Sequence, residues 1–156
     1  MIFEKIRNVR NPERANLNDS WIDFFIPEDL TNDWKWNMLP VDINWKHIIV
    51  IYPWESILIP LWIKVKLDYW TDLTFVNKSW IASKTWVIVW ACLIDKGYIW
   101  ELVLNLINTS VEVIEFKLWQ KIVQWVIRNV NLSLPMEWIV NDITERWEWW
   151  FWSTWV

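Results

Sequence analysis

The polar side chains most able to do chemistry lie between short apolar runs of this sequence. Asp95 follows the run Val87–Ile94 and precedes the run Glu101–Ile107, and the two runs predict a hairpin with Asp95 at its tip. A carboxylate at this position could orient a water molecule and accept its proton. Aspartate is also a common turn former, so the residue alone leaves both interpretations open. Tyr98, three residues on, is equally compatible with a half-buried strand position.

The stretch from Arg146 to Val156, RWEWWFWSTWV, holds a second set of candidate side chains. Arg146 can bind a phosphate through two parallel hydrogen bonds, Ser153 and Thr154 add hydroxyl donors, and Phe151 can stack on a planar base. A solvated chain end and an aromatic surface for membranes or nucleic acid bases are the alternatives. The interleaving of an arginine, an aromatic ring and two hydroxyls favours a nucleotide-binding arm.

The tryptophans of this chain stand where glycine is expected. The 156 residues include 19 Trp and one Gly, whereas an average chain of this length holds roughly 11 Gly. Trp34, Trp45 and Trp54 each follow a residue that commonly precedes glycine in a tight turn, where φ is positive. A Trp side chain clashes at such angles. We therefore hypothesise that most Trp positions are glycine in the working protein, through UGA codons that its organism reads as glycine. Gly97 would then come from an ordinary glycine codon, and a truly Trp-rich protein is the alternative.

Length and charge restrict the class of protein. The chain suits a single domain, and its net charge of −4 offers no general attraction to nucleic acid or to an anionic membrane. Its longest apolar run, Trp86–Ile94, is too short to span a bilayer. The single cysteine, Cys92, excludes an internal disulfide, fits a reducing compartment and is expected as a small buried residue. The composition thus predicts a soluble, cytoplasmic protein without a secretion signal.

The elements that must position these residues are mostly short β-strands. Apolar and polar residues alternate in Ile63–Leu67, which is the period of a half-buried strand. The other predicted strands are Ile22–Ile26, His47–Tyr52, Ile57–Ile59, Leu73–Val76, Val87–Ile94, Glu101–Ile107, Val111–Phe116 and Ile122–Val130. Only Ser79–Lys84 has a helical pattern, so the chain is predicted to be an all-β sandwich or barrel. The predicted units are a β domain over residues 1–143 and, with glycine for Trp, a flexible glycine-rich arm over residues 144–156.

Five stretches, taken in chain order, resemble the sequence motifs of the trimeric dUTPase family. They are Ser20–Phe24, Lys78–Ala82, Ile94–Glu101, Trp119–Gln124 and Arg146–Val156. The glycines of the family motifs coincide here with Trp21, Trp100, Trp119, Trp147, Trp149, Trp150, Trp152 and Trp155. Each motif alone is a weak signal, whereas the five together cover nearly the whole chain and are specific.

The resemblance implies a jelly-roll-like subunit of a homotrimer with shared active sites. It also implies hydrolysis of dUTP to dUMP and pyrophosphate with Mg²⁺ as the cofactor. By resemblance, Asp95 is the general base, Tyr98 packs against the deoxyribose, and Asp23 supports the Mg²⁺–triphosphate through water. The implied substrate-binding residues are Lys78, Ser79, Trp80, Ile94, Tyr98, Gln124, Arg146, Phe151, Ser153 and Thr154. Neither a nucleic acid nor a membrane is implied as a partner.

The chain departs from the family pattern at three positions. Lys78 stands where Arg is usual, which keeps the charge but loses the planar guanidinium. Asn77 replaces a common Pro, and Cys92 replaces a usual Gly. The alternatives are a dCTP deaminase-like enzyme of the same fold and a non-catalytic relative that senses nucleotides or binds proteins. With Trp at so many turn positions, the printed chain is expected to misfold or to be inactive.

Overall fold

The computed structural model describes residues 1–28, 30, 48–131 and 133 of the chain. Within these ranges the secondary structure consists of short strands and one helix. The elements are β1 (Ile2–Lys5), β2 (Ile22–Phe25), β3 (Ile48–Ile51), β4 (Ser56–Pro60), β5 (Ile63–Lys66), β6 (Thr71–Asn77), α1 (Ser79–Thr85), β7 (Val87–Val89), β8 (Leu93–Ile94), β9 (Val103–Asn108), β10 (Ile114–Lys117) and β11 (Lys121–Asn129).

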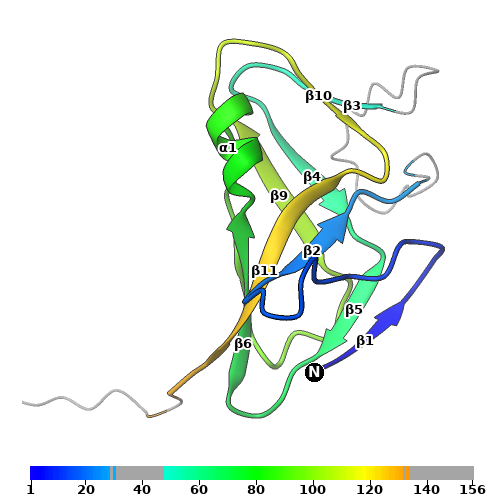
Figure 1. Ribbon diagram of the computed structural model, residues 1–156, viewed down its shortest axis with the longest axis vertical. Coiled ribbons are helices and arrows are strands. Elements are labelled where there is room, and N and C mark those ends of the chain that lie inside the picture. The colour runs from blue at the N-terminus through cyan, green and yellow to red at the C-terminus, as the bar shows by residue number, and fades with distance from the viewer. Residues whose placement is uncertain (29, 31–47, 132, 134–156) are drawn as a thin grey trace, which may run out of the picture.

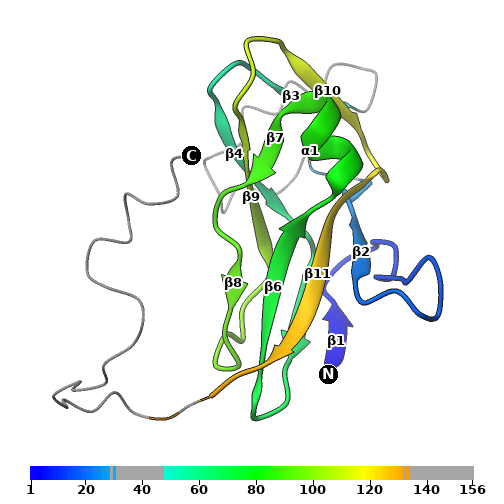
Figure 2. The same ribbon diagram turned by 60° about the vertical axis from the view of Figure 1, so that its left-hand side comes forward.

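Antiparallel pairing arranges the strands in two larger sheets and two ribbons. One sheet has the strand order β2-β11-β6-β8 and the other the order β4-β9-β7. The ribbons pair β1 with β5 and β10 with β3. Figures 1 and 2 show the two larger sheets as separate layers. No sheet in the described ranges closes on itself, so the sandwich expectation is confirmed and the barrel expectation is not.

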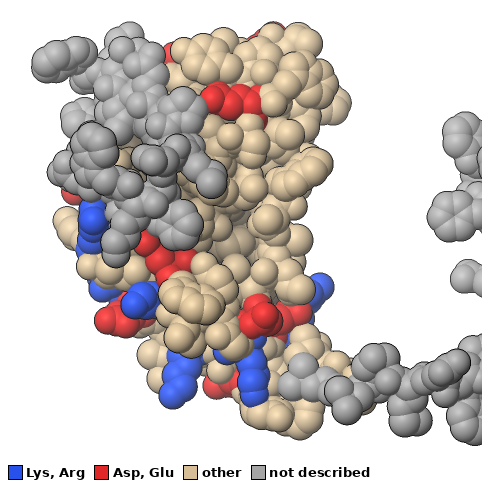
Figure 3. Space-filling model, turned by 180° about the vertical axis from the view of Figure 1, so that it is seen from behind, with Lys and Arg blue, Asp and Glu red and all other residues tan. Residues whose placement is uncertain are grey.

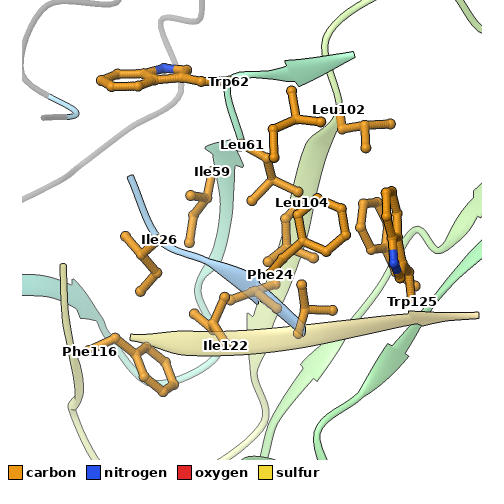
Figure 4. Close-up of a cluster of buried hydrophobic side chains, with 14 of the residues drawn as sticks. Phe24, Ile26, Ile59, Leu61, Trp62, Leu102, Leu104, Phe116, Ile122 and Trp125 are labelled. Carbon is orange, nitrogen blue, oxygen red and sulfur yellow. The ribbon is translucent and has the colours of Figure 1, made fainter. Parts of the chain in front are cut away.

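Apolar side chains of the two sheets meet in one core. Phe24 of β2 and Phe75 of β6 pack around Trp125 of β11, and the rings of Phe24 and Trp125 meet edge-on with centroids 4.0 Å apart. Figure 4 shows Phe24 and Trp125 gathered with Ile59 of β4 and Leu104 of β9. Burial of each such side chain stabilises the fold by about 1.5–3 kcal/mol. The core therefore holds both sheets together and fixes the strand ends that carry the polar residues.

Each predicted strand overlaps an observed strand, but β10 begins only at Ile114, so the first half of the predicted Val111–Phe116 strand is wrong, and the run Val87–Ile94 is two strands. The first part, β7, pairs with β9 as the hairpin prediction requires. The second part, β8, pairs with β6 in the other sheet, so the hairpin prediction is wrong for Ile94. The chain bends at Trp90 and changes sheets, and the Phe75 amide then donates to the Cys92 carbonyl at 2.8 Å. Strand β1 is not among the predicted strands. It forms by pairing with β5, a contact between residues far apart in the chain that the sequence pattern does not indicate.

Three further expectations have an outcome in the fold. Cys92 is exposed rather than buried, because it lies beside β8, the edge strand of its sheet. The helical pattern at Ser79–Lys84 is confirmed by α1. None of the helices in the described ranges has the length and apolar character needed to cross a membrane. His47, the turn candidates Trp34 and Trp45, and the tail from Arg146 lie outside the described residues.

Tryptophan occupies the left-handed backbone positions of the described chain. The non-glycine residues with positive φ in these ranges are Trp54, Trp62, Trp86 and Trp119, with φ between 56° and 66°. Trp86 ends α1 in the αL conformation, where glycine is usual, and its amide donates to the Ala82 carbonyl at 3.0 Å. A Cβ substituent is strained in this region. The backbone thus favours glycine at four positions that carry Trp.

Candidate active site

Charged and polar side chains from β2, β11 and the end of β6 meet at one place. In the sheet register, Gln124 of β11 lies opposite Asp23 of β2. Lys121 is the first residue of β11, and Lys78 follows the last residue of β6. Glu13 joins them through an isolated bridge to Asp23. These five residues are called the ionic cluster.

Asp23 is the centre of the ionic cluster and is 1% exposed. Its Oδ1 accepts hydrogen bonds from Lys78 Nζ at 2.8 Å and from Gln124 Nε2 at 3.1 Å, and its Oδ2 lies 3.2 Å from Lys121 Nζ. Burial by itself raises the pKa of the Asp23 carboxyl, but the hydrogen bonds from Lys78, Gln124 and Lys121 together outweigh it and lower the pKa below its ordinary value. Asp23 is therefore held as a carboxylate, and the structure brings together residues of three predicted motifs.

Lys121 is a residue of the cluster to which the sequence assigned no role. Its Nζ lies 3.0 Å from Glu13 Oε1, and this hydrogen bond raises the pKa of Lys121, with a smaller contribution from Asp23 and against the effect of burial. Glu13 is fixed beside Asp23 by paired backbone hydrogen bonds of 2.8 and 3.2 Å. The sequence could have indicated a role for Lys121, because it is the basic residue of the fourth motif. Glu13 had no such signal, because its bridge to β2 is a tertiary contact.

The ionic cluster leaves little room for direct coordination of magnesium by Asp23. Its Oδ1 already accepts from Lys78 and Gln124, whereas its Oδ2 accepts from Lys121 alone and keeps a lone pair that a water ligand of the metal could use. Within the described ranges, no group of three or more His, Cys, Asp or Glu side chains is placed to hold a metal ion. No catalytic step is therefore assigned to a protein-bound metal here.

Asp95 lies in an exposed loop between β8 and β9. Its Oδ1 accepts a hydrogen bond from the Gly97 amide at 2.8 Å, and its carbonyl accepts from the Tyr98 amide at 3.2 Å. A Cβ on Gly97 would lie 3.3 Å from Asp95 Oδ1, which is a tight contact. Asp95 is thus a turn former through Oδ1, while its side chain remains exposed and available to water.

Tyr98 is held by its own hydroxyl group. The hydroxyl donates to the Glu101 carbonyl at 2.6 Å, and the ring meets Trp100 edge-on with centroids 5.7 Å apart. Burial, and then the charge of Glu101, raise the pKa of the Tyr98 hydroxyl. The phenol is therefore a neutral, fixed group at neutral pH, and its ring is half-buried beside the Asp95 loop.

The structure keeps the Asp95 loop and the ionic cluster apart within one chain. Ile94 pairs with Leu73 of β6, at the edge of the sheet opposite to Asp23. β8 and β2 are separated by β6 and β11, as Figure 2 shows. Three strand spacings correspond to about 14 Å. Ile94, Asp95 and Tyr98 thus form one group, and the ionic cluster forms a second.

The remaining predicted site residues fall into two sets. Ser79 and Trp80 begin α1 directly after Lys78, and both are exposed. Arg146, Phe151, Ser153 and Thr154 lie outside the described residues. The described half of the predicted phosphate site is therefore the ionic cluster with the first turn of α1.

The surface charge outside the cluster is mixed. On the face shown in Figure 3, basic and acidic side chains lie next to one another in the lower half, and the described surface visible above them is mainly uncharged with a few acidic side chains. Neighbouring charges of opposite sign largely cancel their field at a distance. On this face, anion binding therefore depends on local groups.

Comparison with known proteins places the fold. No protein-family model matches the chain, and no curated protein matches it. Solved structures do match, including the native EIAV dUTPase, with 18% identity, a TM-score of 0.68, and coverage of 90% of this chain and 98% of that one. A mutant dUTPase of Staphylococcus bacteriophage 80alpha with dUpNHpp matches at 19% identity and a TM-score of 0.72, over 94% of this chain and 93% of that one. A mutant dUTPase of phage phi11 of S. aureus, described with a structural Mg(II) ion, matches at 18% identity and a TM-score of 0.66, over 90% and 96%. The chain thus has the all-β jelly-roll fold of these dUTPases.

Proposed function

We propose that this protein hydrolyses dUTP to dUMP and pyrophosphate. The observation that carries the proposal is the ionic cluster, which joins Asp23, Lys78 and Gln124 within hydrogen-bond distance from motifs far apart in the sequence. Lys78, which has a single carboxylate partner among the described residues, and the second N–H of the Gln124 amide are the donors of this cluster that can turn to phosphate oxygens. The fold shared with dUTPases supports the same substrate class.

In the proposed reaction, Asp95 orients a water molecule and accepts its proton while the water attacks the α-phosphorus. Pyrophosphate is the leaving group. Lys78, Ser79 and Gln124 donate to phosphate oxygens and offset the charge that develops on them. Tyr98 packs against the deoxyribose, and Ile94 lies beside the base. Trp80 belongs to the same phosphate-binding segment as Ser79.

The C-terminal residues complete the proposed site. Arg146, Ser153 and Thr154 contact the triphosphate, and Phe151 stacks over uracil when the arm closes and excludes water. Magnesium accompanies the triphosphate, because phosphate oxygens and waters supply most of its ligands. We assign no described residue as its ligand. A cytoplasmic location is part of the same proposal.

A homotrimer with shared active sites is the proposed assembly. It is supported by the separation of the Asp95 loop from the ionic cluster across the four-stranded sheet. A nucleotide that contacts both groups needs the loop of one copy to face the ionic cluster of another copy. A closed ring of identical subunits provides this arrangement at every interface.

Glycine at most Trp positions is also part of the proposal. It is supported by the positive φ of Trp54, Trp62, Trp86 and Trp119. It is supported further by the buried indole N–H groups of Trp62 and Trp125, which have no hydrogen-bond partner. Each such group costs about 1–3 kcal/mol. The codons decide the question, since UGG rather than UGA at these positions contradicts the proposal.

The deciding experiment is a nucleotide assay of the protein made with the amino acids that its own codons specify. We expect pyrophosphate release from dUTP with a strong preference over dCTP and UTP, and a loss of about 10²–10⁴-fold in kcat for Asp95→Asn. Release of ammonia from dCTP would indicate a deaminase instead. Binding of dUTP without turnover would indicate a non-catalytic relative.

A further inference from the structure

Asp23 forms ion pairs with two lysines, Lys78 and Lys121. The proposed function needs Lys78 to bind phosphate, so Lys78 must leave Asp23 when the triphosphate binds. The carboxylate is 1% exposed, with Lys78 on Oδ1 and Lys121 on Oδ2. A buried carboxylate that loses its only cation is strongly destabilised. Lys78 can therefore turn toward a phosphate at low cost only if another cation stays on Asp23.

The two lysines are not equivalent. Lys121 Nζ bridges two carboxylates, at 3.0 Å from Glu13 and 3.2 Å from Asp23. Lys78 Nζ contacts Asp23 alone among the carboxylates of the described chain. Glu13 is itself fixed to the backbone of Asp23 by two hydrogen bonds. Detaching Lys121 would disturb two ion pairs, whereas detaching Lys78 disturbs one.

We propose that Lys121 is the resident counter-ion of Asp23 and that it allows Lys78 to transfer its ammonium group from Asp23 to a bound triphosphate. Lys121 is then a positioning residue, and the inference rests on the proposed function. After the transfer, Asp23 keeps Lys121 on Oδ2 and one N–H of the Gln124 amide on Oδ1, which leaves the second N–H of that amide for phosphate. Both lysines stay protonated, so only the partner of Lys78 changes.

The exchange also accounts for lysine rather than arginine at position 78. An arginine opposite Asp23 could bind both carboxylate oxygens with its planar guanidinium group. Lysine is a point charge on a flexible four-carbon chain, and it can change partners with less rearrangement. Lys78 therefore moves to bind phosphate, and Lys121 stays to neutralise Asp23.

The test measures binding of inorganic tripolyphosphate by calorimetry, in the protein made with the amino acids that its codons specify. Lys121→Met keeps most of the aliphatic chain and removes the charge, so Lys78 becomes the only cation on Asp23. We expect tripolyphosphate binding to weaken at least about tenfold. Lys121→Arg should restore most of it. Lys117→Met removes an exposed charge on β10 and is the matched control, with binding unchanged.

The same Lys121 substitution in an Asp23→Asn variant shows whether Lys121 acts through Asp23 or contacts phosphate itself. In Asp23→Asn no carboxylate remains to retain Lys78, so adding Lys121→Met should change tripolyphosphate binding by less than about twofold. Equal weakening in both backgrounds means that Lys121 binds phosphate itself and overturns the inference. Thermal unfolding identifies any variant that does not fold.

If Asp23→Asn does not fold, dUTP kinetics decide. Lys121→Met should raise KM about tenfold while kcat changes by less than about threefold. A fall in kcat at unchanged KM overturns the inference. Absence of tripolyphosphate binding by the unmodified protein overturns it as well. Tripolyphosphate binding without dUTP hydrolysis overturns only the proposed function.

Discussion

At the residue scale, Asp23 is the point where burial and charge oppose each other most directly. Burial disfavours its carboxylate, and the donors Lys78, Gln124 and Lys121 more than compensate. The ion pair between Lys121 and Glu13 keeps one of these donors in place. A single buried charge is thus stabilised by two side chains of β11 and by the lysine that follows β6, and its protonation is coupled to folding.

Acid is expected to remove the stabilisation that Asp23 provides. Because the folded-state pKa lies below the ordinary value of 3.8, this stabilisation is fully present above that value and is lost as the pH falls through the folded-state pKa. We expect the difference in unfolding free energy between the unmodified protein and Asp23→Asn to shrink between neutral pH and about pH 2. Urea unfolding at several pH values measures it. A difference that does not vary with pH would contradict the assignment.

The Asp95 carboxylate lies so close to Gly97 that a larger residue at position 97 would press against it. A Cβ at this position would meet Asp95 Oδ1 at 3.3 Å, so Gly97→Ala should shift the carboxylate by a few tenths of an ångström. We expect dUTP turnover to fall about tenfold while the midpoint of thermal unfolding changes little. Ile99→Ala, at an exposed position in the same loop, is the control. Full activity of Gly97→Ala would show that the position of Asp95 is not critical.

At the element scale, helix α1 has predicted phosphate-binding residues at its start and a left-handed backbone position at its end. The helix follows Lys78, begins with Ser79 and ends at Trp86 in the αL conformation. Glycine is the usual residue at such an end, because it has no Cβ to clash with the backbone. The left-handed end of α1 leads the chain directly into β7, so its conformation is set by the path of the chain.

Replacement of two tryptophans of this segment by glycine should have opposite effects. Trp86 and Trp80 are similarly exposed, at 65% and 60%, but only Trp86 has a positive φ. In a parent protein with glycine at its other Trp positions, Trp86→Gly should raise the unfolding free energy by about 1 kcal/mol, whereas Trp80→Gly in the helix should lower it by about 0.5 kcal/mol. Urea unfolding of both variants gives the comparison. Destabilisation by Trp86→Gly would remove the backbone argument for glycine there.

At the scale of the whole molecule, the fold divides the proposed catalytic groups. Asp95 follows β8 at one edge of the sheet, and Asp23 lies on β2 at the other edge. The core holds β2, β6 and β11 through Phe24, Phe75 and Val123, and Ile94 of β8 packs against it, so bending the sheet to join the two edges would disrupt buried contacts. A second copy of the chain brings such groups together without distorting either subunit.

Mixing two inactive variants tests the shared site. Asp95→Asn lacks the base, and Lys78→Met lacks the phosphate contact, so each alone should be nearly inactive. Co-expressed, they should recover roughly a quarter of the unmodified activity, because one in four interfaces then combines an intact loop with an intact cluster. The dUTP assay on the co-purified oligomer measures the recovery. Activity no higher than that of either variant alone would place both groups in one chain or outside the site.

The sequence by itself determined the features that depend on local chemistry. Alternating apolar residues located the strands, since the side chains of a strand alternate between its two faces. The turn residues before Trp54 marked a left-handed position, because tight turns of this kind require a positive φ. The residue types at Asp23, Lys78 and Gln124 indicated a phosphate site by resemblance, before any contact between them was known.

Only the tertiary structure decided which of these residues meet. It paired β8 with β6 rather than with β9, exposed Cys92 at the sheet edge, and placed the ammonium group of Lys121 within reach of both Glu13 and Asp23. These features depend on strand register and on contacts between residues up to about a hundred positions apart, as for Asp23 and Gln124. Hydrophobic burial sets that register, and it is a property of the packed sheets rather than of any single segment.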